Sequence, residues 1–296
     1  MLHVDLRFEA VLASADHGLQ YLGPTLRGAF GRALKNAVCQ MKHGECERCL
    51  LLDACPYPAI FDGRPPRHLR EAWSSPALPQ PFVLDVAAPD TWDGGPTDLR
   101  WGLRLFGTAA AWSPYVVEAF LRMGRRGIGG RRTPFELVRV LDGVTGEEVW
   151  GQGAETMTPP VPSPLAGVAL PAAGPLRWRF ETPLHVREES AERRDGDGLG
   201  LVGAGRRRGE VLERVYGEGG GGGAGRGPRR LRAGEFTALE SSLRPWGIVR
   251  FSGRQQRRVQ LSGLVGEMVI DGPWNDAGPW LGVAAAIHLG KYSSFG

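Results

Sequence analysis

Long apolar runs are missing from this sequence. No stretch approaches the roughly 18–20 consecutive apolar residues that a membrane-spanning helix needs. The N-terminus also shows no signal-peptide pattern. From these two absences we expect a cytoplasmic protein with no membrane partner.

Two common catalytic signatures are absent as well. The glycine-rich run GEGGGGGAGRG at 217–227 is followed by no Lys-Ser or Lys-Thr pair, so it is not a nucleotide-binding P-loop. We expect it to be a mobile loop, because ordering so much glycine costs backbone entropy. Aspartate and glutamate are scattered along the chain and form no metal-nuclease constellation.

Lysine is scarce, and arginine supplies nearly all of the positive charge behind a formal net charge of +4. Residues 201–232 hold eight arginines against three glutamates, and further clusters lie at 122–132 and 250–258. Arginine suits bidentate phosphate contacts and stacking on bases better than lysine does. A polyanionic partner is one interpretation of these clusters, and a solubilising surface is the other.

The first half of the chain shows a recognisable order of elements. Alternating apolar and polar residues predict strands, and apolar residues at helical spacing predict helices. Their order is β-α-β-β-α-β with one further strand, the ferredoxin-like split βαβ arrangement. The predicted elements lie at 2–13, 23–39, 81–89, 98–107, 113–127, 135–143 and 147–151.

A chain of 296 residues is long enough for two domains. We expect an α+β protein of tandem ferredoxin-like, RRM-like domains. The N-terminal domain is predicted at 1–151, with a cysteine-rich insertion at 39–55. A linker rich in proline and alanine follows at 152–174, and the C-terminal domain with its glycine-rich loop spans 175–296. The predicted elements of the C-terminal domain are a strand at 175–187, a helix at 234–247, strands at 248–253 and 257–272, and a helix at 278–290.

The chain contains four cysteines, and they are close together as C-x6-C-x2-C-x5-C. They are Cys39, Cys46, Cys49 and Cys55. In a cytosolic protein this grouping suits a closed, structural zinc site better than disulfides. An iron–sulfur cluster and buried thiols without a metal remain as alternatives.

Four stretches together resemble one known family: LGPTLRGAFGRALKNAVC, the cysteine cluster, RFSGRQQRRVQLSGLVGEM and PWLGVAAAIHLGKYSSFG. The sequence looks like the CRISPR repeat-RNA processing endoribonucleases of the RAMP superfamily, the Cas "six" group. The resemblance implies cleavage of repeat RNA on the 3′ side of its stem-loop by attack of a ribose 2′-OH, without a catalytic metal. The products carry a 2′,3′-cyclic phosphate and a 5′-OH. It also implies that the protein stays bound to its product beside other Cas subunits.

The chemistry needs a base for the 2′-OH and an acid for the leaving oxygen, and histidine suits both roles. The resemblance places the base on or just after the first helix, which favours His43 and then His17. Lys35 and Tyr21 are the alternative catalysts, since some family members manage without histidine. We expect the other histidines to be structural. A subunit that binds RNA without cutting it, and an unrelated zinc-containing binding protein, stay as alternative functions.

The resemblance implies that the basic hairpin at 250–268 faces the RNA; without it, such a hairpin would more often be a solvated face. Arg258 and Gln260 would share its polar face while Val259 and Leu261 pack inward. The Gly-Lys pair of the last motif is implied to lie against the RNA by the resemblance. The predicted RNA-binding residues are Arg27, Arg32, Arg125, Arg126, Arg131, Arg132, Arg206, Arg207, Arg208, Arg250, Arg254, Arg257, Arg258, Gly290 and Lys291.

Overall fold

The computed structural model describes most of the chain and divides it into two compact units. Unit 1 comprises Met1–Pro164 with Val215–Gly220, and unit 2 comprises Leu165–Arg214 with Gly221–Gly296. Within the described part, no helix is both long and apolar enough to cross a membrane. The described residues are 1–14, 22–41, 46–63, 78–86, 95–165, 170–184, 208–217, 235–252 and 257–274, without the side chains of 250–252.

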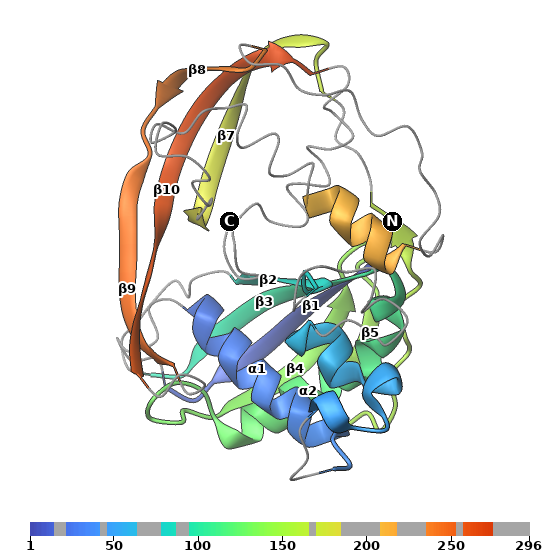
Figure 1. Cartoon of the computed structure of the whole chain (residues 1–296). Helices are drawn as coiled ribbons and strands as arrows, with labels where there is room; N and C mark the ends of the chain where they lie inside the picture. Colours follow the sequence, from blue (N-terminus) through green and yellow to red (C-terminus); the bar gives the residue numbers. More distant parts are fainter. Residues whose placement is uncertain are drawn as a thin grey trace. The chain divides into compact units, whose positions relative to one another are not determined.

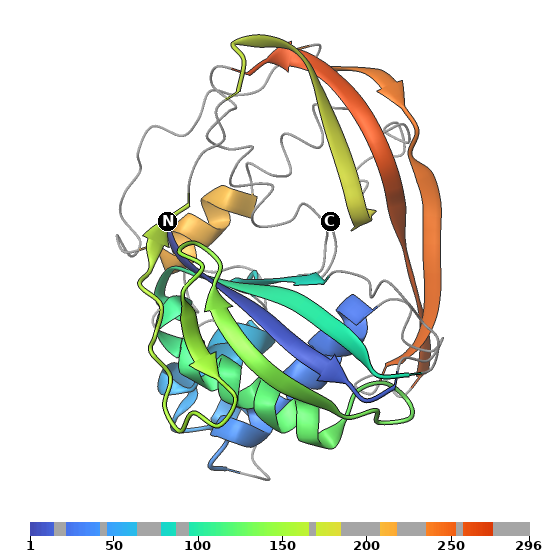
Figure 2. The ribbon, with the colours of Figure 1, turned by 180° about the vertical axis from the view of Figure 1, so that it is seen from behind.

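Unit 1 is an antiparallel sheet with two helices on one face. Its strands stand in the order β2-β3-β1-β4-β5, and β6 also pairs with β1. Helices α1 (Leu22–Val38) and α2 (Ser113–Arg126) lie in front of the sheet in Figure 1 and behind it in Figure 2. The strands are β1 (Leu2–Leu12), β2 (Phe82–Val86), β3 (Thr97–Phe106), β4 (Phe135–Asp142), β5 (Glu148–Gly151) and β6 (Ser163–Pro164).

The chain order β1-α1-β2-β3-α2-β4 confirms the predicted β-α-β-β-α-β arrangement of this half. Short helical turns fill the connections: η2 (Cys46–Arg48), η3 (Leu52–Ala54), the π-helix η4 (Pro58–Asp62) and η6 (Gly107–Trp112). The predicted linker at 152–174 is not wholly irregular, because β6 lies inside it and pairs with the start of β1.

The core of unit 1 follows from the alternation in β1, which turns every second side chain toward the helices. Phe8 stacks on Trp101 of β3 with ring centroids 5.1 Å apart. Phe120 of α2 contacts both rings and stacks on Phe30 of α1 at 5.0 Å. Aromatic contacts therefore join both helices to the two central strands.

The other face of the sheet is charged but internally balanced. Asp5 is buried and accepts hydrogen bonds from Arg7 at 2.7 Å and from Arg104 at 3.1 Å. Arg7 also donates to Asp85 of β2 at 3.2 Å. These guanidiniums neutralise neighbouring carboxylates, so they do not add to a surface for an external polyanion.

Unit 2 is built around β10 (Arg257–Pro273), whose 17 residues pair with three strands. Its neighbours are β7 (Ala173–Leu184), β8 (Thr237–Ser241) and β9 (Arg244–Ser252), all antiparallel. Residues 208–216 are helical, and of these the stretch up to Arg214 belongs to unit 2. The core cluster of this unit consists of Phe180, Leu184, Phe236, Met268, Ile270 and Trp274.

The predicted helix at 234–247 is wrong, because β8 and the start of β9 occupy this stretch. Pro245 cannot donate the backbone hydrogen bond that a helix needs there. The long β10 offers ladder partners instead: Met268 pairs with Ser241, and Val265 pairs with Arg244. The predicted helix at 278–290 lies outside the described residues.

Candidate nucleic-acid interface and cysteine cluster

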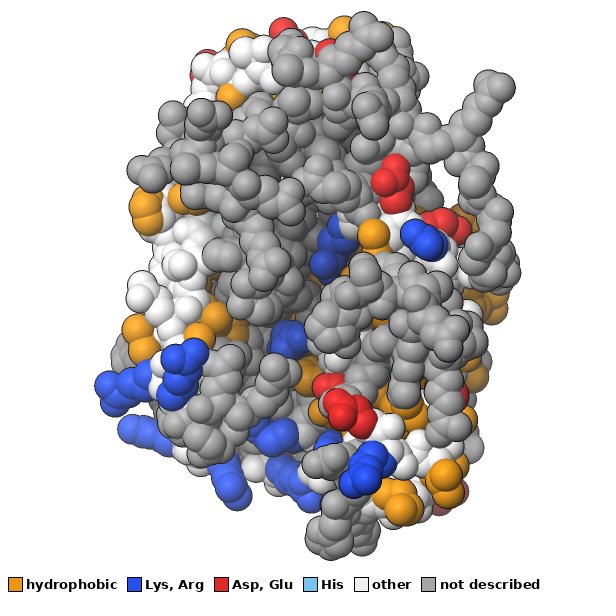
Figure 3. Space-filling view, viewed as in Figure 1, with side chains coloured by type: hydrophobic (Ala, Val, Ile, Leu, Met, Phe, Trp, Pro, Cys, Tyr) orange, Lys and Arg blue, Asp and Glu red, His pale blue; other side chains and the backbone are white. Residues whose placement is uncertain are grey.

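Helix α1 carries three of the predicted site residues, and most of its other side chains pack into the core. Pro24 lies in its first turn, and Leu26, Phe30 and Leu34 are fully buried at helical spacing. Of the basic residues, Arg27 and Lys35 are half-buried and Arg32 is exposed. Lysine and arginine side chains gather over this part of unit 1 in Figure 3.

Arg27 is held by its own protein. Its guanidinium lies 4.9 Å from the centroid of the Phe61 ring and donates a 2.6 Å hydrogen bond to Gln80 Oε1. Gln80 in turn donates from its Nε2 to the backbone carbonyl of Phe61. Gly31 allows this packing, because a Cβ at that position would overlap the Phe61 ring. The structure thus gives Arg27 a structural role in joining α1 to η4.

Replacing Arg27 by methionine is expected to lower the free energy of unfolding by about 1–2 kcal/mol, through loss of the cation–π contact and a charge-assisted hydrogen bond. Arg32→Met is the matched control, since Arg32 is exposed on the same helix. Chemical denaturation measures both variants. Equal stability of the two would contradict the structural role of Arg27.

Four arginines surround the turn between α2 and β4. Arg125 and Arg126 end the helix, and Arg131 and Arg132 follow five residues later, all exposed. Backbone hydrogen bonds fix the conformation of this turn. Ile128 is buried and exchanges two backbone hydrogen bonds with Thr133, at 2.8 and 2.9 Å. The turn therefore presents its arginines on a defined support.

Gly127 is the residue that makes this turn feasible. Its φ is 77° and its ψ 161°, a region that essentially only glycine adopts, and a Cβ there would overlap the Arg132 carbonyl. Gly127→Ala should therefore destabilise the protein by about 1–3 kcal/mol. Gly130→Ala is the control, because nothing lies within 4 Å of a Cβ at that position. Thermal unfolding that shifts equally in both variants would refute this explanation.

The hairpin of β9 and β10 confirms the expected alternation. Arg258 and Gln260 are exposed, Val259 is half-buried and Leu261 is buried. In the ladder, Gln260 pairs with Val249, a valine that is 60% exposed. One face of the hairpin is thus open to solvent and carries both a guanidinium and an amide.

The exposed arginine set consists of those predicted RNA-binding arginines that are exposed and pair with no other described residue. Its members are Arg32, Arg125, Arg126, Arg132 and Arg258. Arg131 and Arg257 are exposed too but have interactions within the protein, and Arg208 is half-buried at the start of the helical segment.

Several predicted site residues lie outside the described part of the chain, and their roles stay predictions. The side chain of Arg250, in β9, is also not described. Those outside are His17, Tyr21, His43, Arg206, Arg207, Arg254, Gly290 and Lys291. Lys35 is described: its Nζ lies 5.5 Å from the centroid of the Tyr57 ring.

The four cysteines come from three neighbouring pieces of backbone. Cys39 directly follows α1, and its N–H donates to the Lys35 carbonyl at 2.9 Å. Cys46 begins η2, and the N–H of Cys49 donates back to its carbonyl at 3.2 Å. Cys55 follows η3 with an extended backbone.

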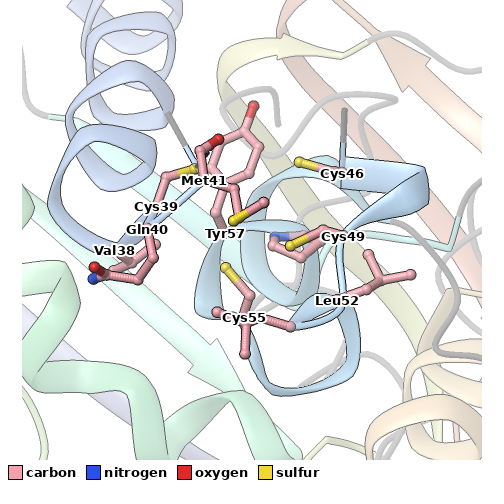
Figure 4. A pocket seen from close by; sticks show the side chains of 11 residues that line it. Val38, Cys39, Gln40, Met41, Cys46, Cys49, Leu52, Cys55 and Tyr57 are labelled. Carbon is pink, nitrogen blue, oxygen red and sulfur yellow. Dashed lines mark hydrogen bonds between the residues drawn. The ribbon is translucent and has the colours of Figure 1, made fainter. Parts of the chain in front are cut away.

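All four cysteines line one pocket, together with Val38, Gln40, Met41, Leu51, Leu52, Tyr57 and Pro58. Figure 4 shows the sulfurs of the cysteines turned toward a shared space. The four residues are thiols rather than disulfides. In the described ranges, no group of three or more His, Cys, Asp or Glu side chains is arranged so that it could already hold a metal ion.

The pKa of the Cys55 thiol depends on the other residues of this pocket. Burial raises the pKa of the Cys55 thiol, and the thiols of Cys39, Cys46 and Cys49 raise it further. A hydrogen bond from the backbone N–H of Tyr57 acts in the opposite direction. The sulfurs are therefore close enough to repel one another as thiolates, which is the arrangement that a shared cation would relieve.

Comparison with known proteins assigns the family. A family model named AF_1859_N, which describes an N-terminal domain, matches residues 3–162, more than half of the chain. The chain belongs to this family. The matched region contains both helices of unit 1, the cysteine cluster, and the strands of its sheet from His3 of β1 to the end of β5, but not β6.

An uncharacterized protein of Archaeoglobus fulgidus is similar to this member of the AF_1859_N family. It is 26% identical over 130 residues, which are 44% of this chain and 43% of the relative. The match thus spans less than half of the relative's length.

Solved structures show which fold this AF_1859_N family member has. A Cas6 product complex matches at a TM-score of 0.50 and 15% identity, over 100% of this chain and 97% of that one. A Thermus thermophilus Cas6 matches at 0.48 and 14% identity, over 100% and 96%. The first of these matches shows that the chain has the fold of Cas6, with tandem ferredoxin-like domains.

Sequence reasoning missed the residues that support the site. Phe61, Gln80 and Tyr57 were not singled out, although Phe61 and Tyr57 contact the basic side chains of α1. Tyr216 was missed too: it lies within unit 1, where its hydroxyl donates to the Pro79 carbonyl at 2.9 Å. The aromatic pair four residues apart in PYPAIF was the one available signal for the first contacts.

Proposed function

We propose that this protein binds CRISPR repeat RNA and cleaves it on the 3′ side of the repeat stem-loop. The observation that carries the proposal is the fold, which matches a Cas6 product complex over nearly the full length of both chains. Two basic surfaces support a polyanionic ligand: the α2–β4 turn and the β9–β10 hairpin. The members of the exposed arginine set on these surfaces pair with no described carboxylate.

The proposed chemistry is attack of a ribose 2′-OH on the adjacent phosphate. A base removes the 2′-OH proton, the new bond closes a 2′,3′-cyclic phosphate, and an acid protonates the leaving 5′-oxygen. His43 is the first candidate for the base and His17 the second. Lys35 and Tyr21 are the further candidates. Lys35 lies over Tyr57, where its ammonium adds positive charge near the end of α1. No metal ion takes part in these steps.

The exposed arginine set is proposed to hold the RNA. Arg32, Arg125, Arg126 and Arg132 belong to unit 1, and Arg258 belongs to unit 2. Guanidiniums can contact the phosphates of an RNA whatever its base sequence. Gln260, beside Arg258, offers an amide that can hydrogen-bond to a base edge. Retention of the cleaved RNA in a cytoplasmic complex with other Cas subunits is part of the same proposal.

The test is an incubation of the full-length protein with its cognate repeat RNA in buffer containing EDTA. We expect one cut 3′ of the stem, with a 2′,3′-cyclic phosphate on the upstream fragment and a 5′-OH on the downstream one. Mass spectrometry of the fragments identifies both ends. Tight binding without any cut would contradict the nuclease proposal and support an RNA-binding subunit without cleavage activity.

A further inference from the structure

The cysteine cluster has a chemistry that the proposed reaction does not use. Four thiols separated by up to 16 positions in the sequence line a single cavity of about 30 Å³. A cavity of about 10–15 Å³ is enough for one water molecule. This cavity therefore has room for one small ion beside the four sulfurs.

We propose that Cys39, Cys46, Cys49 and Cys55 together bind one Zn²⁺ in a closed tetrahedral site. Four thiolates are a ligand set that zinc prefers, and Zn²⁺ has no geometric demand of its own that the backbone must meet. Binding draws the four sulfurs to about 2.3 Å from the ion and releases their protons. With all four positions taken by protein, no site remains for water, so the ion is structural.

The surroundings fit the negative charge that four thiolates would bring. The backbone N–H of Tyr57 already donates to the Cys55 sulfur. Lys35 Nζ lies over the Tyr57 ring, and Tyr57 lines the cavity. The hydrogen bond from Tyr57 is the kind of contact that orients a ligand and stabilises its thiolate.

The site would tie together short elements that follow one another along the chain. Its ligands come from the residue after α1, from η2 with Cys49, and from the residue after η3. The next element is η4, whose Phe61 ring contacts Arg27. Residues 42–45, which include His43, would lie between the first and second ligands. Zinc would thus fix both ends of the stretch that carries the first candidate base.

The first experiment measures metal on the full-length protein, purified without added metal and with any affinity tag removed. We expect about one zinc per chain by mass spectrometry, and four thiols that react with DTNB only after a strong chelator is added. Metal-free protein with four reactive thiols would overturn the proposal. So would iron with acid-labile sulfide, which would identify an iron–sulfur cluster instead.

The second experiment replaces the ion with Co²⁺ and records the absorption spectrum. A tetrathiolate site gives thiolate-to-cobalt charge-transfer bands and intense visible bands, and Cys49→Ser should lose or shift them. Met41→Leu is the matched control, because the Met41 thioether lines the same cavity but is not a proposed ligand. If wild-type protein shows no such bands, or if Met41→Leu changes them as Cys49→Ser does, the ligand set is wrong. Neither experiment contains RNA, so both outcomes are independent of the proposed nuclease activity.

Discussion

Replacing His43 by alanine is expected to lower the single-turnover cleavage rate of repeat RNA by about 10²–10⁴-fold, the usual contribution of a general base or acid. RNA affinity should be unchanged, because the imidazole is proposed to act on the 2′-OH proton rather than to hold the phosphate chain. Rates are measured with protein in excess over RNA, and affinity by filter binding at the same salt concentration.

Two further variants decide what a slow His43→Ala enzyme means. His17→Ala tests the second candidate base on the same assay. His3→Gln is the control for structural histidines: His3 is buried in β1, and its Nδ1 lies 2.9 Å from the Ser163 carbonyl oxygen. If His17→Ala loses the activity and His43→Ala keeps it, the assignment of the base moves to His17. If neither loses it, both histidine assignments are wrong, and Lys35 and Tyr21 become the residues to substitute.

Substituting the whole exposed arginine set with glutamine is expected to weaken repeat-RNA binding by at least about a hundredfold at 0.1 M salt. Each guanidinium that neutralises a phosphate releases counterions, contributing about 0.7–0.9 to the slope of log affinity against log salt. Removing five such contacts should therefore reduce the slope by about 4. Titrations between 50 and 200 mM salt give both quantities.

The matched control for these arginines comes from exposed arginines that already have partners. Arg122 donates to Glu118 at 2.5 Å, and Arg139 donates to Glu9 at 2.7 Å. Both are nearly half exposed, so Arg122→Gln and Arg139→Gln change the net charge without removing an unneutralised guanidinium. A fall in affinity of the same size per charge in these two variants would mean that only net charge matters. The exposed arginine set would then not be the RNA-binding surface.

Much of unit 1 could be predicted from the sequence because its patterns are local. The alternation in 2–13 and the helical spacing in 23–39 gave β1 and α1 to within one residue. The split βαβ order followed from those elements and the strands between them. The hairpin faces of Arg258 and Leu261 were also predictable, since side chains in a strand alternate with period two.

The rest depends on contacts between residues far apart in the sequence. Arg7 and Asp85 are 78 positions apart, and Arg27 and Gln80 are 53 apart, so no local pattern distinguishes an arginine that bonds within the protein from one that is open to solvent. The region around Pro245 became strand because Pro245 pairs with Leu264 of β10, 19 positions later, which a local helical pattern does not reveal. The cysteine spacing showed that the thiols are close together, but not which backbone turns bring them to one cavity.

The central claim is that this protein cuts repeat RNA through the ribose 2′-OH at one position. The most direct test compares two repeat RNAs that differ by a single atom, one native and one with a 2′-deoxy nucleotide immediately 5′ of the cut. We predict that the native RNA is cleaved and that the 2′-deoxy RNA is bound with the same affinity but left intact. Cleavage of both RNAs, or of neither, would contradict the account.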